Sequence, residues 1–198
     1  MIAISRTASA EKRDGIIGLA ADIAEPTGIA HALRDIERIG SPDILVNNAG
    51  AFAVAPVVDT SPDLFTSMLE LNLVAPFRFI RALVPSMRAR GLGHIVTIGS
   101  VADHIPFPGN GAYAASKFAL RGLHEVLRGE LVGTGVRATL VSPSAVGTDL
   151  WEGLDADTRA QFPARNEMLD PGAVARSVVY AVTQPAGVNV DEIRISRA

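Results

Sequence analysis

Short apolar stretches of strand length alternate along this chain with longer stretches in which apolar residues recur at helical spacing. The expected strands span residues 2–5, 16–21, 44–46, 94–98, 136–142 and 191–195. The expected helices span residues 26–39, 62–90, 112–132 and 171–183. We expect the second helix to break or bend near Pro76 and Pro85, because proline lacks the amide hydrogen that a helix interior needs.

The strands at 94–98 and 136–142 are apolar nearly throughout and do not alternate between apolar and polar residues. This pattern indicates burial on both faces, as in a parallel sheet flanked by helices. Regular strand–helix alternation then predicts an α/β fold, with a doubly wound parallel sheet and helices on both faces. Since the sequence shows no repeat, low-complexity tract or linker, we expect a single domain over residues 1–198.

The composition excludes several classes of protein. The net charge is −3 and the 18 lysines and arginines form no basic block, so neither nucleic acid nor a membrane is an expected partner. The absence of cysteine excludes disulfides and cysteine nucleophiles, and no metal site is predicted. The longest apolar stretch, residues 49–58, is too short to cross a bilayer. The first residues lack the apolar run of a signal peptide, so a cytoplasmic protein is expected.

Polar residues follow several expected strands, at the edge where doubly wound sheets bind their ligands. Residues 47–50 read Asn-Asn-Ala-Gly, which is typical of a tight turn whose backbone can approach a ligand closely. Ser100 follows the strand at 94–98, and the run Ser-Pro-Ser at 142–144 ends the strand after it. Each segment also fits an ordinary turn, and it is their expected gathering at one edge that indicates a binding site.

Tyr113 and Lys117 are four residues apart on an expected helix, so their side chains share one face. The pKa of a free tyrosine is about 10, and a nearby ammonium group lowers it by stabilising the phenolate. A tyrosine tuned in this way can donate a proton to a ketone oxygen, or accept one in the reverse direction. Ser100, at the rim of the sheet, is placed to hold a substrate carbonyl towards that hydroxyl. Alone, an exposed Tyr-x-x-x-Lys pair or a turn-capping serine is common.

Asn72 lies in an otherwise apolar helical stretch, LELNLVAPF. An amide that faces a core costs free energy unless it is hydrogen-bonded. Asn72 is therefore either a structural residue at a helix bend or a functional residue, and the stretch around it favours neither interpretation.

Taken together, these motifs resemble the short-chain dehydrogenase/reductase family in its single-domain form of roughly 250 residues. The matching motifs are Ala21-Asp22-Ile23, Asn47-Asn48-Ala49-Gly50, Asn72, Ser100, Tyr113-x-x-x-Lys117 and Pro143-x-x-Val146-x-Thr148. Their order and spacing fit the family over essentially the whole chain. The resemblance implies a Rossmann-like sheet and an oxidoreductase that interconverts a carbonyl and an alcohol.

The resemblance also implies roles for the matching residues. Tyr113 would be the general acid/base, and Lys117 would lower its pKa and hold the nicotinamide ribose. Ser100 would orient the carbonyl, and Asn72 would anchor a water in the proton relay. Asp22 would contact the adenine amino group. The full set of cofactor-binding residues implied is Arg6, Asp22, Ile23, Asn48, Ala49, Gly50, Tyr113, Lys117, Pro143, Val146 and Thr148.

Arg6 bears on the choice of cofactor. Members of the family that prefer NADPH have a basic residue just after the second strand, facing the 2′-phosphate, whereas NAD users commonly have an acidic residue there. Residues 4–7 read Ile-Ser-Arg-Thr, with one arginine and no acid. Because the planar guanidinium group suits phosphate, the segment favours NADP(H) over NAD(H), although a plain surface arginine would look the same.

The family's glycine-rich loop, Thr-Gly-x-x-x-Gly-x-Gly, does not occur in this sequence. Met1 would lie inside the family's second strand, so we expect the first strand and helix, about 30 residues, to be missing. That strand normally lies in the middle of the sheet, and its loss should expose two strand edges. Either the start is wrongly set, or the chain is truly truncated with cofactor binding weak or lost. Ser144, where the family usually has glycine, should narrow the nicotinamide pocket slightly.

The leading hypothesis is an NADP(H)-dependent oxidoreductase, and two rivals remain. One is a truncated, non-catalytic remnant that acts as a binding or oligomerisation partner, and the other is a redox sensor without turnover. The family's substrate lid would span residues 149–169, and its side chains favour a small apolar carbonyl or alcohol substrate. These side chains are Leu150, Trp151, Leu154, Phe162 and Met168, with His104, Ile105 and Phe107 adding to the same pocket. The resemblance also implies a homodimer or homotetramer, formed through the helices that hold Asn72 and Tyr113.

Overall fold

The computed structural model describes residues 1–8 and 14–198. Its strands and helices are β1 (Ile2–Ser5), β2 (Ile17–Ala20), α1 (Pro26–Ile39), β3 (Ile44–Asn47), α2 (Pro62–Leu69), α3 (Ala75–Arg90), β4 (Gly93–Ile98), α4 (Gly111–Leu131), β5 (Val136–Pro143), α5 (Ala156–Ala160), α6 (Pro171–Val182) and β6 (Glu192–Ile195). Every strand and helix expected from the apolar pattern is present, and α5 is additional. Within the described ranges, no helix is long and apolar enough to cross a membrane.

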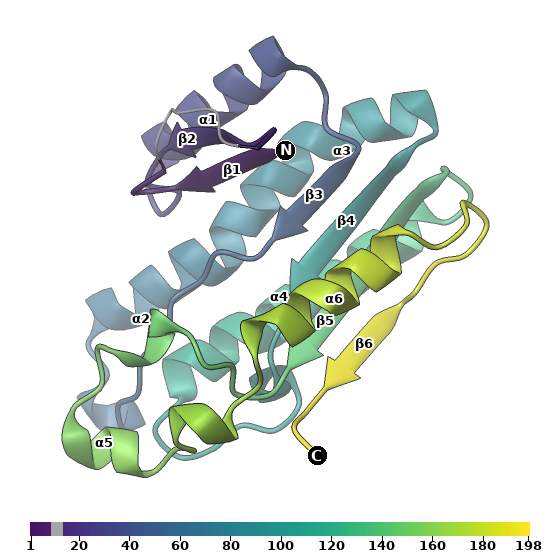
Figure 1. Ribbon diagram of the computed structural model, residues 1–198. Coiled ribbons are helices and arrows are strands. Elements are labelled where there is room, and N and C mark those ends of the chain that lie inside the picture. The colour runs from purple at the N-terminus through teal and green to yellow at the C-terminus, as the bar shows by residue number, and fades with distance from the viewer. Residues whose placement is uncertain (9–13) are drawn as a thin grey trace.

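All the paired strands are parallel, as predicted, but they form two sheets where one was expected. β1 pairs with β2, while β3, β4, β5 and β6 form a four-stranded sheet in that order. No described residue pairs with the outer edge of β3, and Ile44 and Val46 on that strand stay exposed by 45% and 42%. The expected gap beside this strand is therefore left open, with β1 and β2 lying on its far side (Figure 1).

Helices cover both faces of the four-stranded sheet, which confirms a doubly wound arrangement. On one face, α3 and α4 contribute Ile80, Val84, Leu127 and Leu131 to a core with buried residues of β4 and β5. On the other face, α6 packs its valines against Val96, Ile98 and Val141. α1 packs on α3 and on the apolar side chains of β1 and β2. Figure 1 shows α6 alone on its side of this sheet.

The helix expected over residues 62–90 is interrupted once, just before Pro76. A π-helical turn, Glu70–Val74, joins α2 to α3. This wider turn accommodates a proline whose ring would otherwise meet the preceding turn of an α-helix. α3 then continues through Pro85 without a break. Pro85 lies on the exposed side of α3, where water can reach the carbonyl that the missing amide leaves free.

Candidate active site

The carboxyl ends of the strands bring the predicted site residues to one edge of the molecule. All the arrowheads in Figure 1 point the same way, so residues that directly follow a strand share this edge. Arg6 follows β1, Asp22 follows β2 and Ser100 follows β4. α4 begins at the same edge, and it therefore delivers Tyr113 and Lys117 from its first two turns.

Tyr113 is almost fully buried, and its ring packs edge-on against Phe52 with 4.8 Å between the ring centroids. Burial raises the pKa of the Tyr113 hydroxyl, the hydrogen-bonding interaction with the Ser100 side chain lowers it, and the negative charge of Asp103 raises it again. The net direction is upward and Lys117 is not among the causes, so the lowering of this pKa by Lys117 that the resemblance implies does not occur in this arrangement. In this arrangement Tyr113 holds its proton at neutral pH, which is the form that donates to a carbonyl oxygen.

Lys117 is buried, and its ammonium Nζ donates a hydrogen bond to the backbone oxygen of Ile98 at 2.9 Å. The same nitrogen lies 5.8 Å from the centre of the Tyr113 ring. Burial lowers the pKa of Lys117 to about 8, and the nearby charge of Asp103 opposes that shift. A methyl group added to Gly50 would lie 3.9 Å from Nζ, so the turn after β3 closes on this lysine.

Asn72 lies in the π-helical turn, 1% exposed, and its side chain is fully engaged. Its oxygen accepts a hydrogen bond from the amide of Ala51 at 2.8 Å. Its amide nitrogen donates to the Ala51 carbonyl and to the Ser116 hydroxyl, both at 3.0 Å. The side chain therefore clamps the loop after β3 onto α4, which supports a structural role at the helix bend.

Replacing Asn72 with alanine should lower the free energy of unfolding by about 2–4 kcal/mol, because it leaves buried donors and acceptors without partners. Urea unfolding measures this loss. The matched control is Ser116→Ala, which removes one of the three hydrogen bonds of Asn72 and should cost only about 1 kcal/mol. Equal losses in the two variants would show that the clamp on Ala51 contributes little.

The remaining predicted residues reach the same edge but make no direct contact with Tyr113 that the structure records. Arg6 is exposed, and the Asp22 carboxylate accepts from the amide of Ala24 at 3.0 Å. Ile23 packs into the α1 core, Asn48 and Ala49 are exposed, and Pro143 ends β5. The Val146 carbonyl accepts from the Trp151 indole at 2.7 Å and from the Thr148 amide at 2.8 Å.

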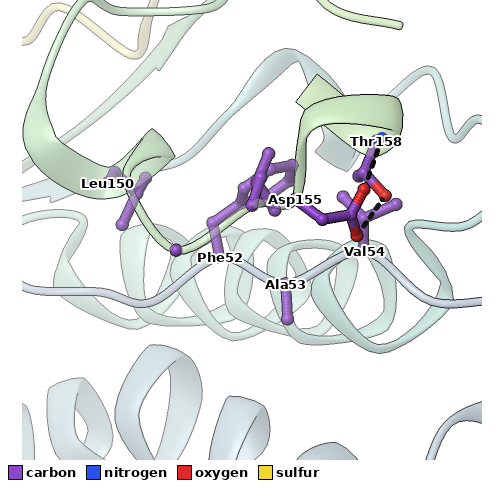
Figure 2. A pocket seen from close by; sticks show the side chains of 8 residues that line it. Phe52, Ala53, Val54, Leu150, Asp155 and Thr158 are labelled. Carbon is purple, nitrogen blue, oxygen red and sulfur yellow. Dashed lines mark hydrogen bonds between the residues drawn. The ribbon is translucent and has the colours of Figure 1, made fainter. Parts of the chain in front are cut away.

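The segment expected to form the lid contacts Phe52, the residue whose ring packs against Tyr113. Trp151 and Phe162 pack against Phe52, with ring centroids 4.9 and 5.8 Å from it, and Phe107 packs on Phe162. Beside Phe52 is a cavity of ≈ 160 Å³, lined by Phe52, Ala53, Val54, Leu150, Gly153, Leu154, Asp155 and Thr158. Figure 2 shows Phe52 and Val54 directed from one segment towards the segment that carries Leu150, Asp155 and Thr158, whereas Ala53 on the same segment points away from it.

Of the side chains predicted for this pocket, Leu150 and Leu154 line the cavity and the other six do not. Ile105 is 61% exposed, and His104 contacts the carboxylates of Asp103 and Glu192. Neither lines the cavity, because the short turn after Ser100 directs His104 towards those two acids. Phe107 does not line the cavity either, and its ring packs on Phe162 with 5.4 Å between the centroids. Met168 is buried.

Sequence reasoning missed two side chains beside Tyr113, which are Phe52 and Asp103. Nothing in the local sequence marks Phe52, since its contact with Tyr113 joins segments far apart in the chain. A signal for Asp103 did exist, because Ser100 and Asp103 have the spacing of a capping box. In a capping box the side chain at each end of the first turn accepts a hydrogen bond from a backbone amide at the opposite end.

Comparison with known proteins agrees with this geometry. Residues 3–159 match the short chain dehydrogenase family. An uncharacterised oxidoreductase of Staphylococcus epidermidis is 33% identical over 178 residues, which are 89% of this chain and 74% of that protein. The closed form of a serine dehydrogenase complexed with NADP⁺ superimposes with a TM-score of 0.82 at 31% identity, over 92% of this chain and 76% of that one.

A metagenomic short-chain oxidoreductase in complex with NADP is similar too, with a TM-score of 0.76 and 29% identity over 92% of this chain and 74% of that one. The family match covers most of the chain, and the arrangement of strands and helices agrees with these solved structures. This protein therefore belongs to the short-chain dehydrogenase/reductase family of oxidoreductases.

Proposed function

We propose that this chain is an NADP(H)-dependent oxidoreductase that interconverts a carbonyl and an alcohol, with Tyr113 as the general acid/base. The observation that carries the proposal is the meeting of three side chains, from α4 and from the turn after β4, at one edge of the sheet. Tyr113 and Lys117 are both buried on α4, and Ser100 at the end of β4 interacts with the Tyr113 hydroxyl. A buried phenol beside a hydroxyl and an ammonium group is chemistry suited to moving a proton on or off a substrate oxygen.

The residues around Lys117 fit the ribose end of a nicotinamide cofactor. The buried ammonium has a single recorded acceptor, the Ile98 carbonyl, so it retains donor capacity for ribose hydroxyls. Gly50 lies against it, and any side chain there would fill the space, since an added methyl group would come within 3.0 Å of the Asn72 oxygen. The buried amide nitrogen of Asn47 also lacks a partner among the described residues. Lys117, Gly50 and Asn47 would thus hold this end of the cofactor.

A bound nicotinamide cofactor would supply or accept the hydride. The protein's own residues would handle the proton and the substrate. Ser100 would donate a hydrogen bond to the carbonyl oxygen and hold it towards Tyr113. In reduction, the Tyr113 hydroxyl would donate its proton to that oxygen, and the Lys117 ammonium would stabilise the resulting phenolate. The aromatic residues of the lid would exclude water from the reacting atoms.

The preference for NADP(H) rests on Arg6, which is exposed directly after β1 and is free to meet a 2′-phosphate. The solved relatives support it in part, because two of those compared above hold NADP or NADP⁺. We further propose a small apolar carbonyl or alcohol as substrate, because apolar side chains such as Phe52, Leu150 and Leu154 are among those that line the cavity. Phe77 on α3 and Phe118 on α4 are exposed, which supports self-association as a homodimer or homotetramer. We also propose that the protein is cytoplasmic.

The test is a titration of the purified chain with NADPH and with NADH, followed by the fluorescence of Trp151, the single tryptophan. We expect tighter binding of NADPH, and a roughly ten- to hundred-fold loss of that preference in Arg6→Ala, because a hydrogen-bonded charge pair is removed. Arg34→Ala, at an exposed position on α1, is the matched control. Turnover is then measured with a panel of apolar ketones and aldehydes. If the chain binds neither nucleotide, the result favours a non-catalytic remnant. If it binds a nucleotide but does not turn over, the result favours a redox sensor.

A further inference from the structure

A carboxylate with no solvent contact lies beside the proposed active site. Asp103 ends the short turn Val101–Asp103 after β4, and its side chain is 0% exposed. Its Oδ2 accepts a hydrogen bond from the backbone amide of Ser100 at 3.2 Å and another from the Ser142 hydroxyl at 2.9 Å. One oxygen therefore joins the ends of two neighbouring strands, β4 and β5.

The Asp103 carboxylate also determines the path of the backbone at this point. A methyl group added to Gly99 would lie 2.5 Å from Oδ2 of Asp103 and 2.9 Å from the Ser142 hydroxyl, so only glycine fits beneath them. Ser100 and Asp103 cap each other, because the Ser100 hydroxyl oxygen accepts from the Ala102 amide at 3.1 Å while Asp103 accepts from the Ser100 amide. The backbone and the side chain of Ser100 are thus both held within this turn.

The other oxygen of Asp103 faces two cationic side chains that it shares with a second acid. Oδ1 is hydrogen-bonded to Nδ1 of His104 and lies 3.9 Å from the Arg121 guanidinium group. Glu192 on β6 binds Arg121 through two hydrogen bonds of 2.9 and 3.0 Å and lies 3.4 Å from His104. Glu125 is a further 3.9 Å neighbour of Arg121. Asp103 also acts electrostatically on two buried groups of the proposed site, because its negative charge shifts the pKa of Tyr113 upward and opposes the lowering of the Lys117 pKa by burial.

We propose that Asp103 is a positioning residue of this active site, which holds the Ser100 hydroxyl against Tyr113 by binding the Ser100 backbone and the Ser142 hydroxyl. This inference rests on the proposed function, because Ser100 and Tyr113 must act on a carbonyl for their alignment to matter. The charge of Asp103 gives the proposal a second consequence. It raises the pKa of Tyr113, in the same direction as burial and against the effect of Ser100. Removing that charge should therefore make Tyr113 ionise at lower pH.

The experiment uses the Tyr180→Phe chain, in which Tyr113 is the only remaining tyrosine. Asp103→Asn is introduced there because asparagine keeps the shape and removes the charge. Glu192→Gln is the matched control, because it neutralises the other acid on His104 and Arg121 without touching Ser100 or Ser142. The first measurement is the pH at which Tyr113 ionises, followed by tyrosinate absorbance, with circular dichroism to verify the fold. The second gives kcat and KM for NADPH-dependent reduction.

We expect Asp103→Asn to lower the ionisation midpoint of Tyr113 and to lower kcat by roughly ten- to hundred-fold, with a smaller change in KM. Glu192→Gln should change neither the midpoint nor kcat appreciably. An unmoved midpoint, or equal effects in both variants, would overturn the proposal, even if Asp103→Asn were less active. If Asp103→Asn does not fold, Ser142→Ala decides the question: loosening the carboxylate should lower kcat, and an unchanged kcat overturns the proposal.

The two proposals can fail separately. If no form of the chain, wild type included, reduces any carbonyl, yet Asp103→Asn still lowers the Tyr113 midpoint, the proposed function is wrong and the coupling between Asp103 and Tyr113 stands. If the wild type turns over normally while Asp103→Asn behaves like Glu192→Gln, the proposed function stands and the positioning role of Asp103 is rejected.

Discussion

Replacing Tyr113 with phenylalanine should lower kcat by about 10²–10⁴-fold, because it removes the only group proposed to exchange a proton with the substrate oxygen. The fold should survive, since the aromatic ring and its edge-on contact with Phe52 remain. NADPH affinity should change little, because Lys117 and Gly50 keep their positions. Steady-state kinetics with the best carbonyl substrate measure the loss, and Trp151 fluorescence measures NADPH binding.

Tyr180→Phe is the matched control for this change. Tyr180 lies on α6 with 58% of its surface exposed, so this variant loses a phenolic hydroxyl far from Ser100 and Lys117. Its kcat should equal that of the wild type. A Tyr113→Phe chain that turns over as fast as this control would exclude Tyr113 as the general acid/base. A wild type that binds NADPH but never turns over would identify a sensor.

Acidification from pH 6.5 to pH 4 should destabilise the protein strongly through two buried histidines. Burial is the main reason that the pKa values of His94 and His124 are lowered from 6.5 to about 4. One nitrogen of each ring contacts a threonine hydroxyl, at 2.8 and 3.0 Å, and the other nitrogen has no partner among the described residues. Protonation would therefore place an N–H with no recorded acceptor in the core, which costs free energy.

The sign of the pH effect follows from linkage. Between pH 6.5 and pH 4 the unfolded chain binds protons at these two rings and the folded chain does not, so stability falls as pH falls through that window. The full loss, reached below pH 4, is roughly 3 kcal/mol for each ring when the shift is converted at 1.36 kcal/mol per pH unit. More than about one unit above pH 6.5, neither ring should contribute appreciable pH dependence, because both states are then unprotonated. Urea unfolding at a series of pH values between 7 and 5 tests this.

Two substitutions isolate the contribution of these rings. His94→Gln places a side-chain amide near the position of Nε2, which contacts Thr139, and His124→Asn places one near the position of Nδ1, which contacts Thr97. Neither new side chain titrates. Both variants should show a shallower fall in stability with pH than the wild type. His31→Gln, on the exposed side of α1, controls for the loss of a histidine as such. Identical pH slopes in all three variants would rule out buried His94 and His124 as the source.

The order of strands and helices was predictable from the sequence because it depends on local apolar spacing. The strand at 136–142 is apolar nearly throughout, and in the structure it is covered by α4 on one face and α6 on the other. The proposed catalytic pair was equally accessible, since the i, i+4 spacing of Tyr113 and Lys117 places both side chains on one helix face. Membership of the short-chain dehydrogenase/reductase family followed from the order of such local motifs.

The contacts that shape the site were decided by tertiary packing. The sequence did not reveal whether another segment would cover Ile44 and Val46 at the open edge of β3. None of the described segments does, and the strands therefore form two separate sheets. The upward pKa shift of Tyr113 arises mainly from its burial, and its ring packs on Phe52, a contact that sequence spacing does not encode. Hydrogen bonds over long sequence separations placed Asn72 against Ser116 and Asp103 against Ser142. Sequence periodicity reports which face of a single helix or strand is buried, and only the folded chain determines which distant side chains meet there.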